Sequence, residues 1–137
     1  MKKTITLTAF LVTTFLLANN YAYGAIGGYS VSLANDEWEA LVDTQVQIAA
    51  DLTNNQNRAQ PFAYFVQIQN EDGVTVSLSW ITGSLEPGQF MNPSQSWTPT
   101  IPGKYTAQIF VWESVDNPDA LSVPLTIKIN VVETRNT

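Results

Sequence analysis

Two-residue alternation of apolar and polar side chains recurs along this chain of 137 residues, and it constrains the fold more than any other feature. Successive side chains of a β-strand point to opposite faces of the sheet, so this period predicts strands with one face in a core. Turn-forming residues separate seven alternating segments: 29–34, 46–53, 62–69, 74–82, 90–97, 104–113 and 125–132. The pattern predicts an all-β fold, an immunoglobulin-like Greek-key β-sandwich of about seven strands.

The stretches between these segments carry turn and loop signals. Asp72-Gly73 tolerates positive φ and predicts a hairpin between the third and fourth segments. Pro102-Gly103 suits a type II turn before the sixth segment, because Pro presets φ and Gly accepts φ > 0. The polar, acidic stretch 35–39 predicts a connection rather than a strand.

One antiparallel register between the third and sixth segments explains which side chains lie on each face of these two strands. If these strands are antiparallel neighbours, like side chains meet on one face in three cross-strand pairs: Gln67 with Gln108, Phe65 with Phe110, and Ala63 with Trp112. The opposite face of each strand then lies in the core. The register therefore predicts that Phe65, Phe110 and Trp112 lie on the outside of one sheet.

Three other aromatic residues are predicted to be structural. Tyr105 follows the predicted type II turn directly, at the place where a tyrosine corner would lie. Trp97 and Trp80 fall on the predicted core faces of their strands. Trp80 shares its face with three aliphatic residues: Val74, Val76 and Leu78.

The N-terminal residues are typical of an export signal. Two lysines precede the apolar run 5–18, and Ala22-Tyr23-Gly24 places small residues at the −3 and −1 positions of a cut before Ala25. The organisation is then a signal peptide at 1–24, a β-sandwich at 25–132 and a short polar tail at 133–137. An uncleaved anchor is the alternative, although the run is shorter than the roughly 20 residues of a membrane span. We therefore expect a secreted protein, extracellular or on the cell surface, with no membrane insertion after cleavage.

Charge and missing residue types exclude several classes of function. Loss of the two leader lysines would leave four basic residues against twelve acidic ones and change the net charge from −6 to −8. Such a surface does not suit nucleic acid or anionic membranes, since phosphate neutralisation supplies that affinity. The chain has no His and no Cys, which removes His-dependent nucleophilic catalysis, ordinary zinc sites and type I copper centres. We expect neither enzymatic activity nor a cofactor.

Weak signals exist for Ca²⁺ and for carbohydrate. Asp116, Asn117 and Asp119 offer oxygen ligands of the kind that Ca²⁺ prefers, but they lack the EF-hand spacing. A solvated turn accounts for the same three residues. The four Trp residues make a carbohydrate ligand a further alternative, because aromatic faces stack on sugar rings.

Several short motifs resemble a known family. Leu85-Glu86-Pro87-Gly88-Gln89, Ser96-Trp97-Thr98-Pro99 and Pro102-Gly103-Lys104-Tyr105 are similar to the second half of CARDB-type immunoglobulin-like modules, which are cell-adhesion-related domains of bacterial and archaeal surface proteins. The resemblance covers about half of the mature chain. It implies a seven-stranded sandwich used in adhesion or as a spacer, and it implies no catalytic residues. Trp112-Glu113-Ser114 with Asp116-Asn117-Pro118 also resembles uncharacterised secreted single-domain proteins of ammonia-oxidising archaea.

Three functional hypotheses follow. The first is an interaction or adhesion module that binds a protein partner, or itself, through the sheet face bearing Phe65, Phe110 and Trp112. The second is a structural subunit of an extracellular filament or matrix, in which an arm at 25–34, hinged at Gly27-Gly28, adds as a strand to a neighbour. The third is a carbohydrate-binding or Ca²⁺-dependent module.

Overall fold

The computed structural model of the chain describes residues 27–133, so the predicted leader at 1–24 and all but the first residue of the predicted tail lie outside the described residues. Every helix or strand assigned within 27–133 is a strand. The ten strands are β1 (Tyr29–Ser32), β2 (Glu37–Leu41), β3 (Val46–Ala49), β4 (Asp51–Asn54), β5 (Gln60–Gln69), β6 (Thr75–Leu85), β7 (Phe90–Met91), β8 (Ser94–Trp97), β9 (Gly103–Trp112) and β10 (Leu125–Val132). The all-β prediction is confirmed.

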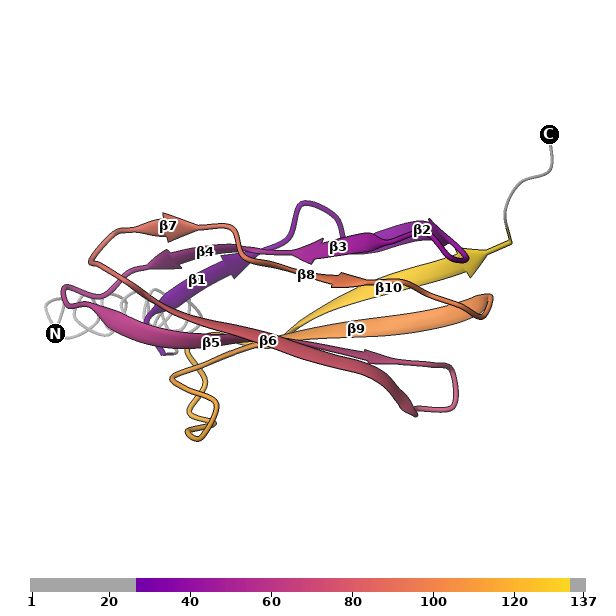
Figure 1. Cartoon of the computed structure of the whole chain (residues 1–137). Coiled ribbons are helices and arrows are strands. Elements are labelled where there is room, and N and C mark those ends of the chain that lie inside the picture. Colours follow the sequence, from indigo (N-terminus) through magenta and orange to yellow (C-terminus); the bar gives the residue numbers. More distant parts are fainter. Residues whose placement is uncertain (1–26, 134–137) are drawn as a thin grey trace, which may run out of the picture.

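The strands form two layers with the core between them (Figure 1). One layer is a five-stranded sheet in the order β2-β10-β9-β5-β6, and the other contains a three-stranded sheet, β1-β4-β7, and the pair β3-β8. If β3 with β4 and β7 with β8 are each taken as one interrupted strand, the sandwich has eight strands: the seven predicted segments and β2, which lies in the other layer from β1. The immunoglobulin-like sandwich is therefore the observed fold.

The stretch 35–39 differs from the prediction, because β2 begins at Glu37 and pairs in parallel with β10. The acidic side chains of β2, Glu37 and Glu39, lie on its exposed face. Trp38 packs against the core and Ala40 is buried. Backbone pairing and two apolar inward residues therefore outweigh the acidic side chains, which remain in water.

Two predicted strands are interrupted, and the interruptions lie together. The segment 46–53 breaks at Ala50, and the segment 90–97 breaks before Pro93. The Ala50 N–H donates to the Pro93 carbonyl at 3.3 Å, and the Asn92 side-chain amide donates to the Ala50 carbonyl at 3.0 Å. Since Pro has no N–H, the regular ladder cannot continue through this point.

The predicted type II turn at Pro102-Gly103 is wrong. Gly103 has φ of 149° and is the first residue of β9, where it pairs with Val131. A type II turn needs φ near +80° at that position. The hairpin prediction, in contrast, is confirmed. Gly73 has φ of 77°, and the Asn70 side-chain oxygen accepts hydrogen bonds from the Asp72 and Val74 N–H groups, each at 3.0 Å.

The core faces of the central strands match the alternation. Alternate residues of β5, β9 and β10 are almost fully buried, among them Tyr64, Val66, Ile109 and Ile129. The Tyr64 hydroxyl donates to the Ile48 carbonyl at 3.0 Å and so links the two layers. Burial raises the pKa of Tyr64 well above its usual value, because the charged form would lose its hydration.

The tyrosine corner is also confirmed. The Tyr105 hydroxyl donates to the Ile101 carbonyl at 2.7 Å, four residues upstream. Its ring packs edge-on against Trp97, with ring centroids 5.0 Å apart. Trp97 is partly buried against the core, as predicted for a structural residue.

Candidate functional site

The outer face of the five-stranded sheet carries a row of aromatic side chains across three strands. The predicted register between β5 and β9 is observed, with Gln67 opposite Gln108, Phe65 opposite Phe110, and Ala63 opposite Trp112. On the other side of β5, Phe65 lies opposite Trp80 of β6. Phe65 is therefore flanked by an aromatic ring on each neighbouring strand. We refer to Phe65, Trp80, Phe110 and Trp112 as the aromatic surface.

The rings of the aromatic surface pack against one another. The Phe65 centroid lies 4.5 Å from that of Trp112 and 6.0 Å from that of Trp80, and Phe110 and Trp112 are 6.2 Å apart. All three pairs are tilted, within the range of favourable aromatic contacts. This packing changes one prediction. Phe65 lies on the outer face as expected, but it is only 7% exposed because its aromatic neighbours cover it.

The exposed part of the surface is Trp80, which was predicted to lie in the core. Trp80 is 50% exposed, and Leu78, two residues earlier on the same face, is 54% exposed. The register decides the orientation, because Ser79 pairs with the core residue Val66 while Trp80 pairs with Phe65. The core assignment of Trp80, Leu78, Val76 and Val74 is therefore wrong.

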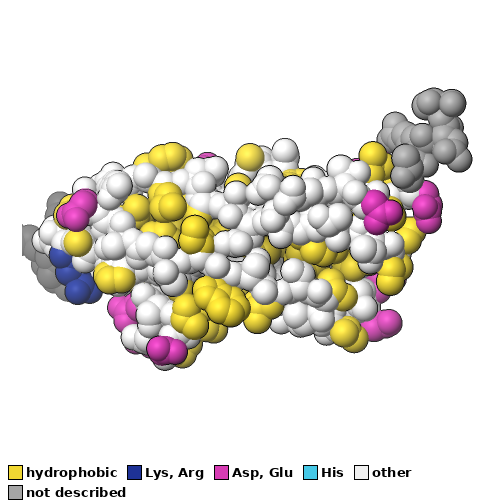
Figure 2. All heavy atoms as spheres, viewed as in Figure 1, with side chains coloured by type: hydrophobic (Ala, Val, Ile, Leu, Met, Phe, Trp, Pro, Cys, Tyr) yellow, Lys and Arg dark blue, Asp and Glu magenta, His cyan; other side chains and the backbone are white. Residues whose placement is uncertain are grey.

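Figure 2 shows hydrophobic side chains gathered along the lower part of the molecule, over β6 and beside the loop that follows β9. This loop, residues 113–124, is held against the end of β9 by backbone hydrogen bonds. The Glu113 N–H donates to the Asp119 carbonyl at 3.0 Å, and the Leu121 N–H donates to the Val111 carbonyl at 2.7 Å. Ala120 forms an isolated bridge with Trp112. The loop therefore borders the aromatic surface without covering Trp80.

The candidate Ca²⁺ residues lie in this loop as a hydrogen-bonded turn. The Asn117 side-chain oxygen accepts from the Asp119 N–H at 3.1 Å, and its amide donates to a Glu113 carboxylate oxygen at 2.7 Å. Both ends of the Asn117 side chain are thus used within the loop. Among residues 27–133, no three acidic side chains gather into a group able to hold a metal ion.

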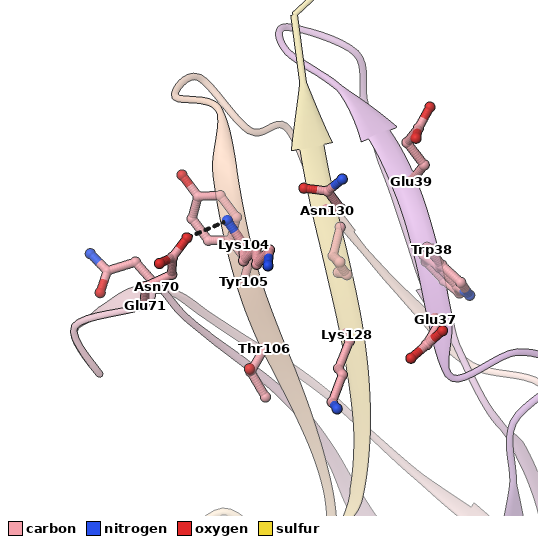
Figure 3. Close-up of a pocket in the computed structure, with 11 residues that line it drawn as sticks. Glu37, Trp38, Glu39, Asn70, Glu71, Lys104, Tyr105, Thr106, Lys128 and Asn130 are labelled. Carbon is pink, nitrogen blue, oxygen red and sulfur yellow. Dashed lines mark hydrogen bonds between the residues drawn. The ribbon is translucent and has the colours of Figure 1, made fainter.

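A second feature of the outer face is a shallow hollow of about 690 Å³ with charged side chains in its lining (Figure 3). It lies over β2, β10 and β9, near the hairpin that carries Glu71. The Lys104 backbone N–H donates to a Glu71 carboxylate oxygen at 3.2 Å, and Lys128 lies opposite Glu37 in the register. The lining mixes both signs of charge. The outer face is therefore polar and charged at one end and aromatic at the other.

The arm proposed in the second hypothesis lies within its own domain where the structure describes it. β1 pairs antiparallel with β4 over four residues. Tyr29 is buried, its hydroxyl donates to the Gln60 carbonyl at 2.6 Å, and its N–H donates to the Leu121 carbonyl at 3.0 Å. Burial raises the pKa of Tyr29 to about 12. Residues 25 and 26 of the arm lie outside the described residues.

Comparison with protein families decides the family. The S-layer A-like family matches residues 30–136. The chain belongs to this S-layer A-like family. A search of curated protein sequences finds no significant match. The family points to a surface or extracellular β-domain, in agreement with the coarse prediction of localisation. No helix among residues 27–133 has the length and hydrophobicity needed to cross a membrane.

Solved structures show the same fold. One is a crystal structure of the CARDB domain of a Pyrococcus furiosus protein, described as a complex with di-metal ions. That domain is 20% identical to this chain, and the match covers 76% of this chain and 87% of that one with a TM-score of 0.56. A solution structure of the same domain is 21% identical, covering 77% and 94% of the chains at a TM-score of 0.58. The CARDB-like fold suggested by the motifs is confirmed.

Part of a glycoside hydrolase also matches this S-layer A-like chain. A family 123 glycoside hydrolase from Clostridium perfringens is 10% identical, with a TM-score of 0.58, over 78% of this chain and 28% of that one. At this identity the likeness concerns the fold alone. It therefore offers no catalytic residues to look for in this chain.

Proposed function

We propose that this S-layer A-like protein is a non-catalytic structural module of an extracellular protein layer. In this proposal it binds a neighbouring protein subunit of that layer through the aromatic surface. The observation that carries the proposal is the half-exposed Trp80, aligned with Phe65 and Phe110 on the face that points away from the core. The family supports the location, and the exposed aromatic row supports a protein contact.

The composition of this surface suits a protein–protein contact. Trp is among the residues that contribute most to binding energy when they are fully desolvated. The cross-strand neighbours of the row, which include Gln67, Gln108 and Thr82, are uncharged. A partner would therefore cover apolar rings without burying an unpaired charge, which is the costly event at an interface.

The residue types also support a role without catalysis. The full sequence contains no His and no Cys, so the most common general base and the thiolate nucleophile are missing. The hollow of Figure 3 is open, and charges of both signs are among its lining residues. A structural role requires none of this chemistry, only a stable sandwich and a surface that binds.

The test is retention of the protein at the cell surface. Cells of the native producer carry either the wild type, Trp80→Ser or the matched control Phe90→Ser. Phe90 is 59% exposed on β7, in the other layer. We expect Trp80→Ser to be released into the medium while Phe90→Ser stays in the envelope fraction. Equal retention of folded Trp80→Ser and wild type would contradict the proposal.

A further inference from the structure

β6 has an unusual free edge. It is the terminal strand of the five-stranded sheet, so within residues 27–133 no strand pairs with its second edge. It is eleven residues long, and its sequence, TVSLSWITGSL, contains no charged residue and no Pro. Natural edge strands usually avoid this combination, because a long uncharged edge can pair with another strand.

The other free edges in the described part of the chain are protected. β2, at the opposite edge of the same sheet, has five residues and carries Glu37 and Glu39. The edge strands of the second layer are short, with four residues in β1 and two in β7. The pair β3-β8 has four residues in each strand. β6 is therefore the one long, uncharged edge among residues 27–133.

Exposed apolar side chains are concentrated on the same strand and the turn before it. Nine large hydrophobic residues of the described chain are exposed, and five of them lie between positions 74 and 81: Val74, Val76, Leu78, Trp80 and Ile81. The edge therefore combines unpaired backbone groups with apolar side chains. Both would be covered in one step if another strand added there.

We propose that the partner at this edge is a second copy of the same chain, with the two β6 strands paired antiparallel about a twofold axis. This inference rests on the proposed function and specifies its partner. The pairing would join two five-stranded sheets into one of ten strands. It would also join the two aromatic surfaces, because like faces meet when the register keeps Leu78 and Trp80 on the outer side.

The lack of charge on β6 makes it a surface at which two copies of this acidic chain can meet without like charges facing each other. The chain has a net charge of −6, so two copies repel one another over most of their surfaces. β6 contains no charge, and neither do Phe65, Gln67 and Ala63, which flank it on the outer face. Length also matches, since an antiparallel strand pairs with itself over its whole extent. A twofold contact of this kind is closed, so it produces a dimer without leaving a new long edge.

The first experiment measures association of the purified protein by sedimentation over a range of concentrations. We expect a monomer–dimer equilibrium. Leu78→Lys should raise the dimer dissociation constant by about tenfold or more, because each copy would place a charge without an opposite partner in a contact that is otherwise uncharged and apolar. The matched control is Ile101→Lys, since Ile101 is 66% exposed and lies in the loop before β9. The control should dimerise as the wild type does.

The second experiment locates the contact with single cysteines, which is straightforward because the natural chain has none. Val76→Cys, Leu78→Cys and Thr82→Cys are placed along the outer face of β6 and treated with a short thiol cross-linker. In an antiparallel self-pair, a residue n positions from the axis lies about 6.6 Å × n from its mate along the strand. Cross-linking should therefore be strongest at the position or positions nearest the axis and decline steeply away from it along the strand. Thr126→Cys, on the outer face of β10, should not cross-link.

The outcomes separate the two proposals. A protein that stays monomeric at every concentration overturns the self-pairing. If Trp80→Ser is nevertheless lost from the cell surface, the proposed function stands with a different protein as the partner. Cross-linking of Thr126→Cys as strong as that of the β6 variants would mean face-to-face packing and would overturn the edge contact. Normal retention of Trp80→Ser contradicts the proposed function itself.

Discussion

Removal of the Phe65 ring provides the strongest test of how the aromatic surface is built. Phe65 is 7% exposed although it lies outside the sandwich core, because the Trp112 and Trp80 rings flank it at 4.5 and 6.0 Å. Burial of a Phe side chain is worth about 1.5–3 kcal/mol, and each aromatic pair adds about 0.5–1.5 kcal/mol. We expect Phe65→Ala to lower the free energy of unfolding by about 3 kcal/mol, the low end for a core Phe, since water can enter from the open face.

The assay is urea unfolding followed by far-UV circular dichroism, because the neighbouring Trp residues make fluorescence ambiguous. Trp80→Ala is the matched control and should cost only about 1 kcal/mol, since half of that side chain is already in water. A double-mutant cycle between Phe65→Ala and Trp112→Ala should give a coupling energy of about 1 kcal/mol. The reasoning is refuted if Phe65→Ala costs no more than Trp80→Ala, or if the two changes are additive.

Two further predictions concern tyrosines. Tyr105→Phe removes the 2.7 Å hydrogen bond to the Ile101 carbonyl and should lower the free energy of unfolding by about 1 kcal/mol. Thermal unfolding should show this as a decrease in Tm of about 4–8 °C, and an unchanged Tm would contradict a stabilising role for the tyrosine corner. Burial raises the pKa of Tyr29 to about 12 in the folded protein, against 10.0 for an ordinary tyrosine. The neutral side chain therefore makes its full contribution to the free energy of unfolding below pH 10, and that contribution is lost as the pH rises towards 12. The urea midpoint should therefore fall over that range, and more steeply in the wild type than in Tyr29→Phe.

The sequence was enough to predict the strands and the register at the centre of the sheet. On β5 and β9 the two faces differ in chemistry, so one pairing matches Gln with Gln and Phe with Phe, and that pairing is the observed one. The acidic stretch at Glu37 was less informative. Its strand exists because β10 offers a partner edge and because Trp38 and Ala40 reach the core, and neither fact is visible in a five-residue window.

The orientation of β6 was the larger error, and its cause shows why the site was only partly predictable. Alternation divides the side chains of a strand into two sets, but it does not say which set faces inward. The usual assumption places the apolar set in the core. Here the register with β5 places Ser79 against Val66 and leaves Trp80 outside.

Edge position makes this inversion tolerable. The core beside β6 is already filled by larger residues of β5 such as Tyr64 and Phe62, so the small Ser79 suffices opposite Val66, and Gly83 lies so close to the Phe62 ring that a Cβ there would come within 2.9 Å of it. Ile81, on the same inner face, remains 38% exposed. The outer set, with Leu78 and Trp80, is left without a partner in the described chain. A strand that turns its apolar side chains to solvent along an uncharged edge gains stability only when a second strand or surface covers them, which is the physical basis for assembly through β6.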